Sequence, residues 1–419
     1  MKQDKLKCFG RVLSSAFIEK KAKKYGAADR RRRKLTLVPF FWLSIFSHFH
    51  KAENGFLNLL VSRFVGSFVG ATGWRKDKGV KTISRMAISK QFARRSWKLF
   101  RDIFEYLLKE YKGDISERKK RLFIDFVDVI AVDATVVYLC RLLDKIYRAT
   151  NKAMAALKMH VKFSVVNLVP EKGMKITSET TNERKYNFTS KISNFLYIFD
   201  LGYYGIAVFN KIMSAYSFFV SRMKSNIDPL IVIGEHAGKK LSEVIKGVRS
   251  LSVDLMVDLT TTGEQLKEHL RLIGIKHRGE WYFYLTNIKD TKFRPKDIYT
   301  IYTQRWAIEI FFNELKHVLR LENIVCRNEN GIKIEIYAAL ILYMMTKIVI
   351  REASRYSGLP VHHFSFKRSF ELMTQIIELV YLKIVYQGYE LERLIRWSCY
   401  VLVNCGLKDA WYINNKLRA

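Results

Sequence analysis

The chain has 419 residues, 49% of them hydrophobic, so it is long enough to fold around one or more real cores and is no disordered tail. Its 73 Lys and Arg against 39 Asp and Glu leave a net charge of +34, which predicts a polyanionic partner, nucleic acid before an anionic membrane surface. The first 100 residues carry 24 Lys and Arg against 5 Asp and Glu, so this quarter is the expected main docking surface.

The sequence has no pattern typical of a membrane or exported protein. Its longest apolar run, residues 336–350, is shorter than the ~20 residues of a membrane span and contains Lys347, so we expect a buried core helix there. The basic start resembles a signal peptide, but Arg11 interrupts the apolar region, so no export is predicted. Five scattered cysteines without a C-x-x-C pair fit a reducing cytoplasm.

Residues 1–120 are expected to form a basic helical region that binds DNA. Over 84–111, apolar positions recur at helical spacing beside basic ones, which is typical of a helix-turn-helix or of a basic surface helix. An ordinary solvated helix face is the alternative. The candidate DNA-binding residues of this region are Arg30, Arg31, Arg32, Arg33, Arg94 and Arg95.

Strands are predicted from residue 122 onwards. Near-continuous apolar runs at 122–139, 157–170 and 193–205 indicate a sheet that is covered on both faces. Two of these runs reach an aspartate followed by a bend of small residues, so Asp133 and Asp200 are candidates for strand ends where loops open a site. An aspartate at such a position is also a common turn former or helix cap.

A later helix is expected to carry a third acid. Four polar side chains of the run 302–316 fall within an arc of about 60° on a helix that turns ~100° per residue. They are Tyr302, Arg305, Glu309 and Lys316. This stripe borders the apolar side of the helix instead of opposing it. The spacing alone also fits a solvated salt-bridge ladder, because Arg305 and Glu309 are an i, i+4 pair worth a few tenths of a kcal/mol at a surface.

The spacing Y-x2-R-x3-E-x6-K of these four residues resembles the signature that closes the catalytic core of bacterial insertion-sequence DDE transposases. VDAT around Asp133 is similar to the first aspartate box of that family, and FDLGYY around Asp200 to its second. FVSRMKSN at 219–226 is similar to the basic strand that follows. The resemblance covers about 125 to 350, whereas the two ends of the chain match only in position and helical character.

The resemblance implies an α/β fold with an RNase H-like catalytic core, interrupted by a β-rich insertion domain and flanked by N-terminal and C-terminal helical regions. The 108 residues between Asp200 and Glu309 contain further strand-like runs, which agrees with such an insertion. The expected parts are the DNA-binding region 1–120, the first core segment 121–215, the insertion 216–294, the second core segment 295–350 and a helical region 351–419 where a dimer contact is expected.

By the same resemblance, Asp133, Asp200 and Glu309 are the expected catalytic residues and the ligands of two Mg²⁺ ions, for which Mn²⁺ can substitute. Hard Mg²⁺ prefers carboxylate oxygens, and two ions can stabilise both the attacking and the leaving oxygen of a phosphodiester. The family nicks transposon ends, passes through hairpins and joins the ends to target DNA. Asp125 and Asp128 are rivals for the first position, but distance along the strand and side-chain parity disfavour them.

The resemblance also assigns DNA contacts. Tyr302, Arg305 and Lys316 are expected to grip phosphates, because Arg offers a planar fork, Lys a point charge and Tyr a hydroxyl donor. Arg222 and Lys224 are candidates for backbone contacts.

Trp281 lies about where hairpin-forming relatives stack a flipped base, although packing within its own strand is at least as expected. His160, a lone histidine on a strand, is assigned no role.

The expected partners are double-stranded DNA, as transposon inverted-repeat ends and as target, and a second copy of the chain in a homodimer. The expected place is the cytoplasm, at the nucleoid, with no membrane contact. Two other functions stay open on the sequence: a catalytically inactive, transposase-derived DNA-binding protein, and an RNase H-like nuclease that cuts without strand transfer.

Overall fold

The computed structural model describes residues 14–29, 35–48, 84–112, 121–151, 154–190, 192–259, 265–374 and 391–409. The chain divides into two compact units. The first comprises residues 1–114, 139–146 and 313–419, and the second comprises residues 115–138 and 147–312.

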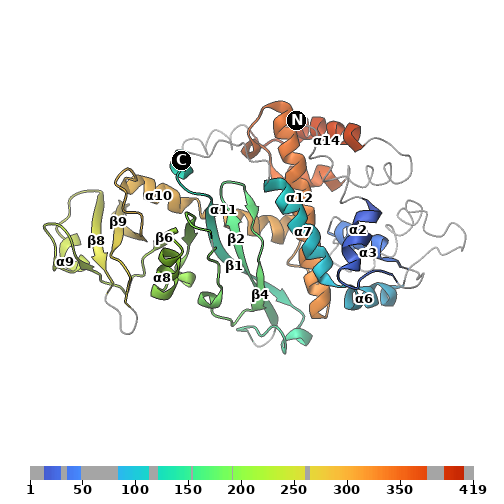
Figure 1. Cartoon of the computed structure of the whole chain (residues 1–419), viewed down its shortest axis with the longest axis horizontal. Helices are drawn as coiled ribbons and strands as arrows, with labels where there is room; N and C mark the ends of the chain where they lie inside the picture. Colours follow the sequence, from blue (N-terminus) through green and yellow to red (C-terminus); the bar gives the residue numbers. More distant parts are fainter. Residues whose placement is uncertain are drawn as a thin grey trace, which may run out of the picture. The chain divides into compact units, whose positions relative to one another are not determined.

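Strands dominate the second unit. They are β1 (Val129–Leu139), β2 (Ala155–Ser164), β3 (Val169–Pro170), β4 (Lys175–Ser178), β5 (Leu196–Phe199), β6 (Phe218–Arg222), β7 (Leu230–Ile231), β8 (Ser252–Asp258), β9 (Leu270–His277) and β10 (Glu280–Thr286). Together they form one sheet in the order β3-β2-β1-β5-β6-β10-β9-β8-β7, with β4 pairing with an earlier part of β2, on the same edge as β3 (Figure 1). The pairs β1–β5 and β5–β6 are parallel, and β6–β10 is antiparallel.

The described residues of this unit also form four helices and three 3₁₀ turns. The helices are α8 (Ile206–Ser214), α9 (Leu241–Ile245), α10 (Pro295–Thr303) and α11 (Trp306–Asn313), and the turns are η3 (Arg121–Phe123), η5 (Glu183–Lys185) and η6 (Leu201–Tyr203). Helix α8 packs on the sheet through Phe209, whose ring stacks on Phe219 of β6 with centroids 4.5 Å apart. The structure is therefore a mixed α/β fold around one large sheet.

The central strands are buried because both of their faces are apolar. Residues 129–132 of β1 and all four residues of β5 are buried, as near-continuous apolar runs predict. Strand β6 pairs with β5 on one side and with β10 on the other. The sheet therefore continues without a break from the first expected core segment into the segment 216–294.

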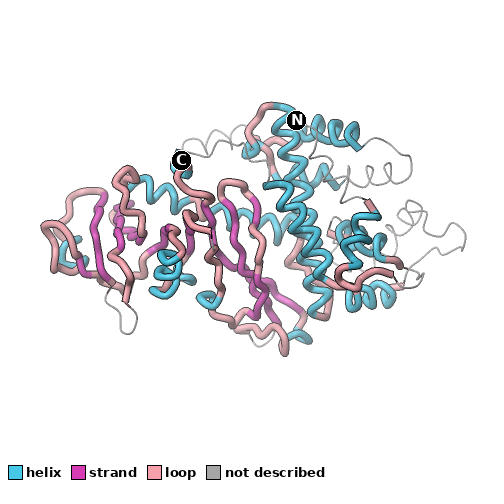
Figure 2. The backbone as a smooth tube through the Cα atoms, viewed as in Figure 1, coloured by secondary structure: helices cyan, strands magenta, loops and turns pink. Residues whose placement is uncertain are grey.

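The described part of the first unit consists of helices and loops (Figure 2). Its helices are α2 (Ser15–Lys23), α3 (Leu37–Phe46), α6 (Arg85–Arg94), α7 (Trp97–Lys112), α12 (Glu329–Ser357) and α14 (Leu391–Cys405), with the short turns η4 (Arg141–Leu143), η7 (Glu314–Val318, π-helical) and η8 (Val361–His363). Helix α7 lies along α12 (Figure 1), and Trp97 of α7 stacks on Tyr337 of α12 with ring centroids 5.7 Å apart.

Helix α12 confirms the buried helix expected at 336–350. Its residues in that range are all buried, including Lys347, whose ammonium lies 5.2 Å from the ring centroid of Tyr343. The Asn328 side chain accepts a hydrogen bond from the Gly331 N–H at the start of the helix, and Gly358 ends it with a left-handed backbone. No helix within the described ranges is long and apolar enough to span a membrane.

Candidate active site

The parallel pairing of β1 with β5 sets two aspartates beside each other. The register runs from Val129↔Leu196 to Val132↔Phe199, so the next residue on each chain is Asp133 and Asp200. Neighbouring strands lie about 4.8 Å apart, and residues in register point to the same face of a sheet. The two carboxylates are therefore neighbours at the point where the β1–β5 pairing stops.

The expectation that Asp133 ends its strand is wrong. Strand β1 continues to Leu139, so Asp133 is an interior residue of the strand. What ends at Asp133 is the pairing with β5, because the chain turns into η6 directly after Asp200. Asp200 itself does follow its strand. The Leu201 N–H donates to Asp200 Oδ1 at 2.7 Å and the Ala134 N–H to Asp133 Oδ1 at 2.8 Å, which orients both carboxylates.

The row of side chains continues across the sheet. Phe199 pairs with Ser221, so Arg222 is the next residue beside Asp200, and Arg222 in turn lies opposite Tyr284 of β10. The ring of Tyr284 contacts the ring of Tyr302 in α10 with centroids 4.9 Å apart. Helix α10 thus covers the same face of the sheet on which the acidic pair lies.

A single continuous helix over 302–316 was expected, and this is wrong. Helix α10 ends at Thr303, α11 begins at Trp306, and η7 follows from Glu314. Between the helices, the N–H groups of Arg305, Ala307 and Ile308 bond to carbonyls three residues back, which tightens the chain into a turn. The ideal 100° spacing therefore does not hold along this segment.

Arg305 nevertheless gathers the polar residues of this segment. Its guanidinium lies 2.6 Å from Glu309 Oε1 through Nη2 and 3.4 Å from Asp133 Oδ2 through Nη1. The same group lies 5.9 Å from the ring centroid of Tyr302. One side chain in the turn thus connects an acid of α11 with an acid of the sheet.

The charges of the site are poorly solvated. Burial raises the pKa of Asp133 to about 6; the Ala134 N–H and Arg305 oppose this rise, while the charges of Asp200 and Glu183 add to it. Burial also raises the pKa of Tyr302, and the charge of Asp200 adds to this effect. At Asp133, burial therefore outweighs the opposing charge of Arg305.

The donor set suits a hard divalent cation. Carboxylate oxygens are the ligands that Mg²⁺ prefers, and a cation beside Asp133 and Asp200 would offset the cost of their burial. Among the residues that the structure describes, no three His, Cys, Asp or Glu side chains converge closely enough to hold one metal ion as they stand. Glu309 reaches the pair only through the guanidinium of Arg305, which occupies the place between two of the three acids.

Lys316 belongs to the first unit, in η7, seven residues after Glu309. Burial lowers the pKa of its half-buried ammonium group, and Glu322 opposes this shift.

Two basic candidates of β6 and its following loop lie against tyrosines. Arg222 is exposed, and its guanidinium carbon lies 5.3 Å from the ring centroid of Tyr282. The ammonium nitrogen of Lys224 lies 5.1 Å from the ring centroid of Tyr204. Trp281 is partly buried and stacks on Phe283 with centroids 6.0 Å apart.

The candidate DNA-binding arginines of the N-terminal region differ in exposure and in whether the structure describes them. Residues 30–33, which are Arg30, Arg31, Arg32 and Arg33, lie outside the described residues. Arg94 is exposed. Arg95 is buried, and its guanidinium donates to the carbonyl of Ala27, to Gln91 Oε1 and to the carboxylate of Asp29. We therefore assign Arg95 to helix packing and leave it out of the DNA contacts below.

The two rival acids lie elsewhere. Asp128 is buried and accepts hydrogen bonds from Ser164 and Asn167, and Asp125 pairs with Lys292 at 3.3 Å. Both carboxylates therefore have partners of their own.

Sequence reasoning missed Glu183, whose charge acts on Asp133, and the hydrogen-bonded role of His160. No periodic pattern marks Glu183, because it lies in a turn and reaches the site through tertiary contacts.

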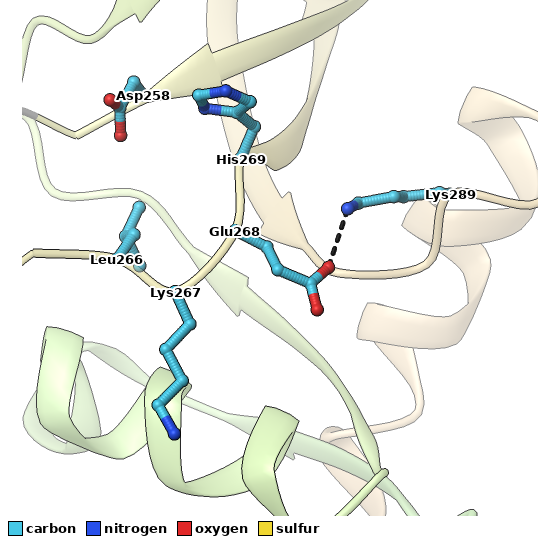
Figure 3. Close-up of a pocket in the computed structure, with 6 residues that line it drawn as sticks. All are labelled: Asp258, Leu266, Lys267, Glu268, His269 and Lys289. Atoms are coloured by element: carbon cyan, nitrogen blue, oxygen red, sulfur yellow. Dashed lines mark hydrogen bonds and ion pairs between the residues drawn. The ribbon is translucent and has the colours of Figure 1, made fainter.

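A separate hollow lies beside the ends of β8, β9 and β10 (Figure 3). Its lining residues are Asp258, Leu266, Lys267, Glu268, His269 and Lys289. Glu268 and Lys289 form an exposed ion pair at 2.7 Å, drawn as the dashed line in Figure 3. None of the candidate site residues lines this hollow.

Comparisons with known proteins identify a family for this chain. A family model described as Transposase DDE domain matches residues 126–345, more than half of the chain and all three acids. The protein therefore belongs to the family of transposase DDE domains.

Two relatives of this chain are also named as transposases. The chain is 29% identical over 224 residues to y4zB of Sinorhizobium fredii, which is named as a transposase; the match covers 52% of this chain and 60% of that one. It is 26% identical over 172 residues to a protein of Geobacillus stearothermophilus named as a transposase for insertion sequence element IS5377, covering 41% of this chain and 44% of the relative. The chain thus spans less than two thirds of these relatives.

Proposed function

We propose that this protein is a DDE transposase that cleaves transposon ends and joins them to target DNA, with Asp133, Asp200 and Glu309 as the catalytic acids. The observation that supports this most is the β1–β5 register, which makes Asp133 and Asp200 neighbours, while Arg305 connects Asp133 with Glu309. Membership of the DDE family and the names of the relatives agree with this proposal.

The proposed architecture is an RNase H-like core with a β-rich insertion. The parallel strands β1, β5 and β6, with α8 and α11, would form the core, and β7 to β9 would belong to the insertion. The long interval between Asp200 and Glu309 supports this division. The expected ranges 1–120, 121–215, 295–350 and 351–419 stay proposals on this basis, and the expected insertion 216–294 would begin only after β6, which ends at Arg222.

The three acids would hold two Mg²⁺ ions, which when bound would stabilise the attacking and leaving oxygens of a phosphodiester. Main-chain N–H groups orient two of these carboxylates before any substrate arrives. Arg305 neutralises Asp133 and Glu309 in the absence of DNA, and its planar guanidinium suits a phosphate when DNA is bound. The partly buried Tyr302 supports that guanidinium from α10.

DNA would be held by basic side chains around the acids and by the N-terminal helices. Arg305 carries a proposed phosphate contact near the scissile bond, and Lys316 is proposed as a phosphate contact from the family resemblance alone. The exposed Arg222 and Arg94 suit the DNA backbone. Lys224, which is partly buried, stays a candidate for a contact with the DNA backbone because it carries a positive charge.

Cleavage through hairpins and a homodimer on DNA are proposed from the family resemblance. Trp281→Ala tests the hairpin step. A variant that binds DNA ends and nicks them normally but accumulates nicked ends before the hairpin would support base stacking by Trp281. Unchanged hairpin formation would assign this ring to packing on Phe283.

The function is tested by incubating the purified protein with Mg²⁺ and the DNA that flanks its gene, and resolving nicks, hairpins and joined products. We expect Asp133→Asn, Asp200→Asn and Glu309→Gln each to abolish cleavage while DNA-end binding persists. Asp290→Asn, which removes an exposed carboxylate outside the cluster, is the matched control. Cleavage retained by Asp200→Asn would overturn the assignment of the catalytic acids. If the wild-type protein cleaves DNA without joining it, the protein is a nuclease. If the wild-type protein binds DNA ends without cleaving them, it is an inactive relative of the transposases.

A further inference from the structure

The turn that carries Asp200 is packed against a second turn of the chain. Glu183 opens η5, whose start is capped by Asn182, and the Asn182 side chain accepts a hydrogen bond from the Arg184 N–H at 3.0 Å. The Glu183 carboxylate lies so close to Gly202 that a Cβ atom at Gly202 would overlap Glu183 Oε2. A side chain at position 202 would therefore displace this carboxylate from its place beside the turn.

The other oxygen of Glu183 is held from the sheet. Lys158 of β2 donates from Nζ to Glu183 Oε1 at 3.2 Å and to the carbonyl of Thr181 at 3.3 Å. The side chains of Lys158 and Glu183 are only 13% and 27% exposed, so their pairing is sensitive to geometry. The carboxylate is thus bonded to β2 through Lys158 and lies against the backbone of η6 at Gly202.

A second set of hydrogen bonds fixes the far end of the same turn. The hydroxyl of Tyr203, the last residue of η6, lies 3.1 Å from Nδ1 of His160, and Nε2 of His160 lies 3.1 Å from Oγ1 of Thr177. Both His160 and Tyr203 are buried. Two residues of β2 therefore act on this region: His160 contacts Tyr203 of η6 directly, and Lys158 bonds the Glu183 carboxylate that lies against Gly202.

We propose that Glu183 is a positioning residue: Lys158, Glu183 and Gly202 form a clasp that fixes the turn after Asp200 and thereby the place of the Asp200 carboxylate. The inference rests on the proposed metal-binding role of Asp200. Residues that hold a metal ligand in place without touching the metal typically contribute about 10-fold to 100-fold to metal affinity.

A role in stability alone explains the clasp less well. Filling the space against Gly202 requires only an apolar side chain, and buried ion pairs are often replaceable by apolar residues at no cost in stability. Glu183 instead adds a third carboxylate to a region that already holds Asp133 and Asp200. A charged contact that fixes one geometry is expected where the position of a neighbouring group matters.

The test measures Mn²⁺ affinity of the full chain by calorimetry, with circular dichroism to confirm folding. We expect Glu183→Ala and Gly202→Ala each to weaken Mn²⁺ binding about tenfold, and the double variant to be no weaker than either single one. Glu183→Gln is expected to bind Mn²⁺ within a few fold of wild type, since its amide keeps the shape and accepts from Lys158.

These variants separate the effect of the position of the Glu183 carboxylate from the effect of its charge. Gly202→Ala keeps every charge of the site and only displaces the Glu183 carboxylate, so a loss of affinity in this variant cannot come from a lost negative charge. The matched control is Glu268→Gln, which removes the exposed carboxylate paired with Lys289 (Figure 3) and is expected to leave Mn²⁺ affinity unchanged. If Glu183→Ala fails to fold, Gly202→Ala and Lys158→Met carry the comparison.

The clasp would be overturned if Gly202→Ala or Glu183→Ala binds Mn²⁺ with wild-type affinity while Asp200→Asn loses Mn²⁺ binding. This result would leave the proposed function standing. Additive losses in the double variant would also overturn it, because Gly202 and Glu183 would then act separately. Mn²⁺ binding unchanged in Asp200→Asn would overturn the metal assignment itself and the clasp with it.

Discussion

Arg305 places a positive charge where the proposed metal ions need negative oxygens. Because its guanidinium contacts both Asp133 and Glu309, it competes with a divalent cation for the same carboxylates. We expect Arg305→Gln to lower the melting temperature of the metal-free protein, since the acids lose their only bonded cation among the described residues. Saturating Mg²⁺ should then raise the melting temperature of the variant more than that of wild type.

Thermal unfolding with and without Mg²⁺ checks this expectation. Arg294→Gln is the control, because Arg294 begins the same helical segment but pairs with Asp297 at the surface. An equal Mg²⁺ shift in wild type and Arg305→Gln would mean that the guanidinium and the ion do not share the carboxylates.

His160 gives the fold a specific sensitivity to acid. Burial, with the nearby charges of Lys158 and Lys175, lowers the pKa of His160 from 6.5 to about 4. The unfolded chain therefore takes up a proton below pH 6.5 that the folded chain refuses until pH 4, so stability is full above pH 6.5 and falls as the pH drops through this window. The loss amounts to about 3 kcal/mol at 1.36 kcal/mol per pKa unit.

Denaturant unfolding from pH 7.5 to 4 measures this effect. We expect His160→Gln to be less stable than wild type at pH 7.5 but to lose less free energy of unfolding on acidification. His277→Gln, at an exposed position, should follow the wild-type curve. Parallel curves for wild type and His160→Gln would show that His160 does not carry this pH dependence.

At the scale of elements, the local sequence pattern predicted those helices and strands whose formation depends on burial of their own residues. The apolar runs of β1 and β5 and the buried helix α12 follow from composition and period, because burial on all sides requires apolar residues at every position. The break between α10 and α11 was not predictable, since Tyr302 to Ile308 reads as regular helix and only i→i+3 bonding in the folded chain reveals the turn. Asp133 was misplaced because a strand can continue after its pairing partner ends.

The end of α12 allows an element-scale prediction. Gly358 adopts φ of 72°, a left-handed conformation in which a Cβ is strained, so Gly358→Ala should lower the free energy of unfolding by about 1 kcal/mol. Gly247→Ala is the matched control, because Gly247 has no positive φ and its added Cβ meets only Val244 O at 3.8 Å. Denaturant titration of both variants should show the loss only for Gly358→Ala.

At the scale of the whole molecule, the candidate site depends on contacts between distant segments. The three acids were found through a resemblance in spacing, yet their neighbourhood is set by the β1–β5 register and by Arg305, neither of which any local pattern contains. Glu183 remained hidden for the same reason. The net charge, in contrast, needs no knowledge of tertiary contacts, because the excess of Lys and Arg over Asp and Glu follows from composition alone. This excess agrees with a family named for transposases.

In the proposed function, Asp133, Asp200 and Glu309 form one metal site from three distant parts of the chain. Fe²⁺ in place of Mg²⁺, with ascorbate and peroxide, cuts the backbone beside bound iron, and mass spectrometry locates the cuts. We expect cuts near residues 133, 200 and 309 together, all suppressed by excess Mg²⁺ and by Asp200→Asn. Cuts at one of these segments alone, at unrelated positions, or unchanged in Asp200→Asn would contradict the claim.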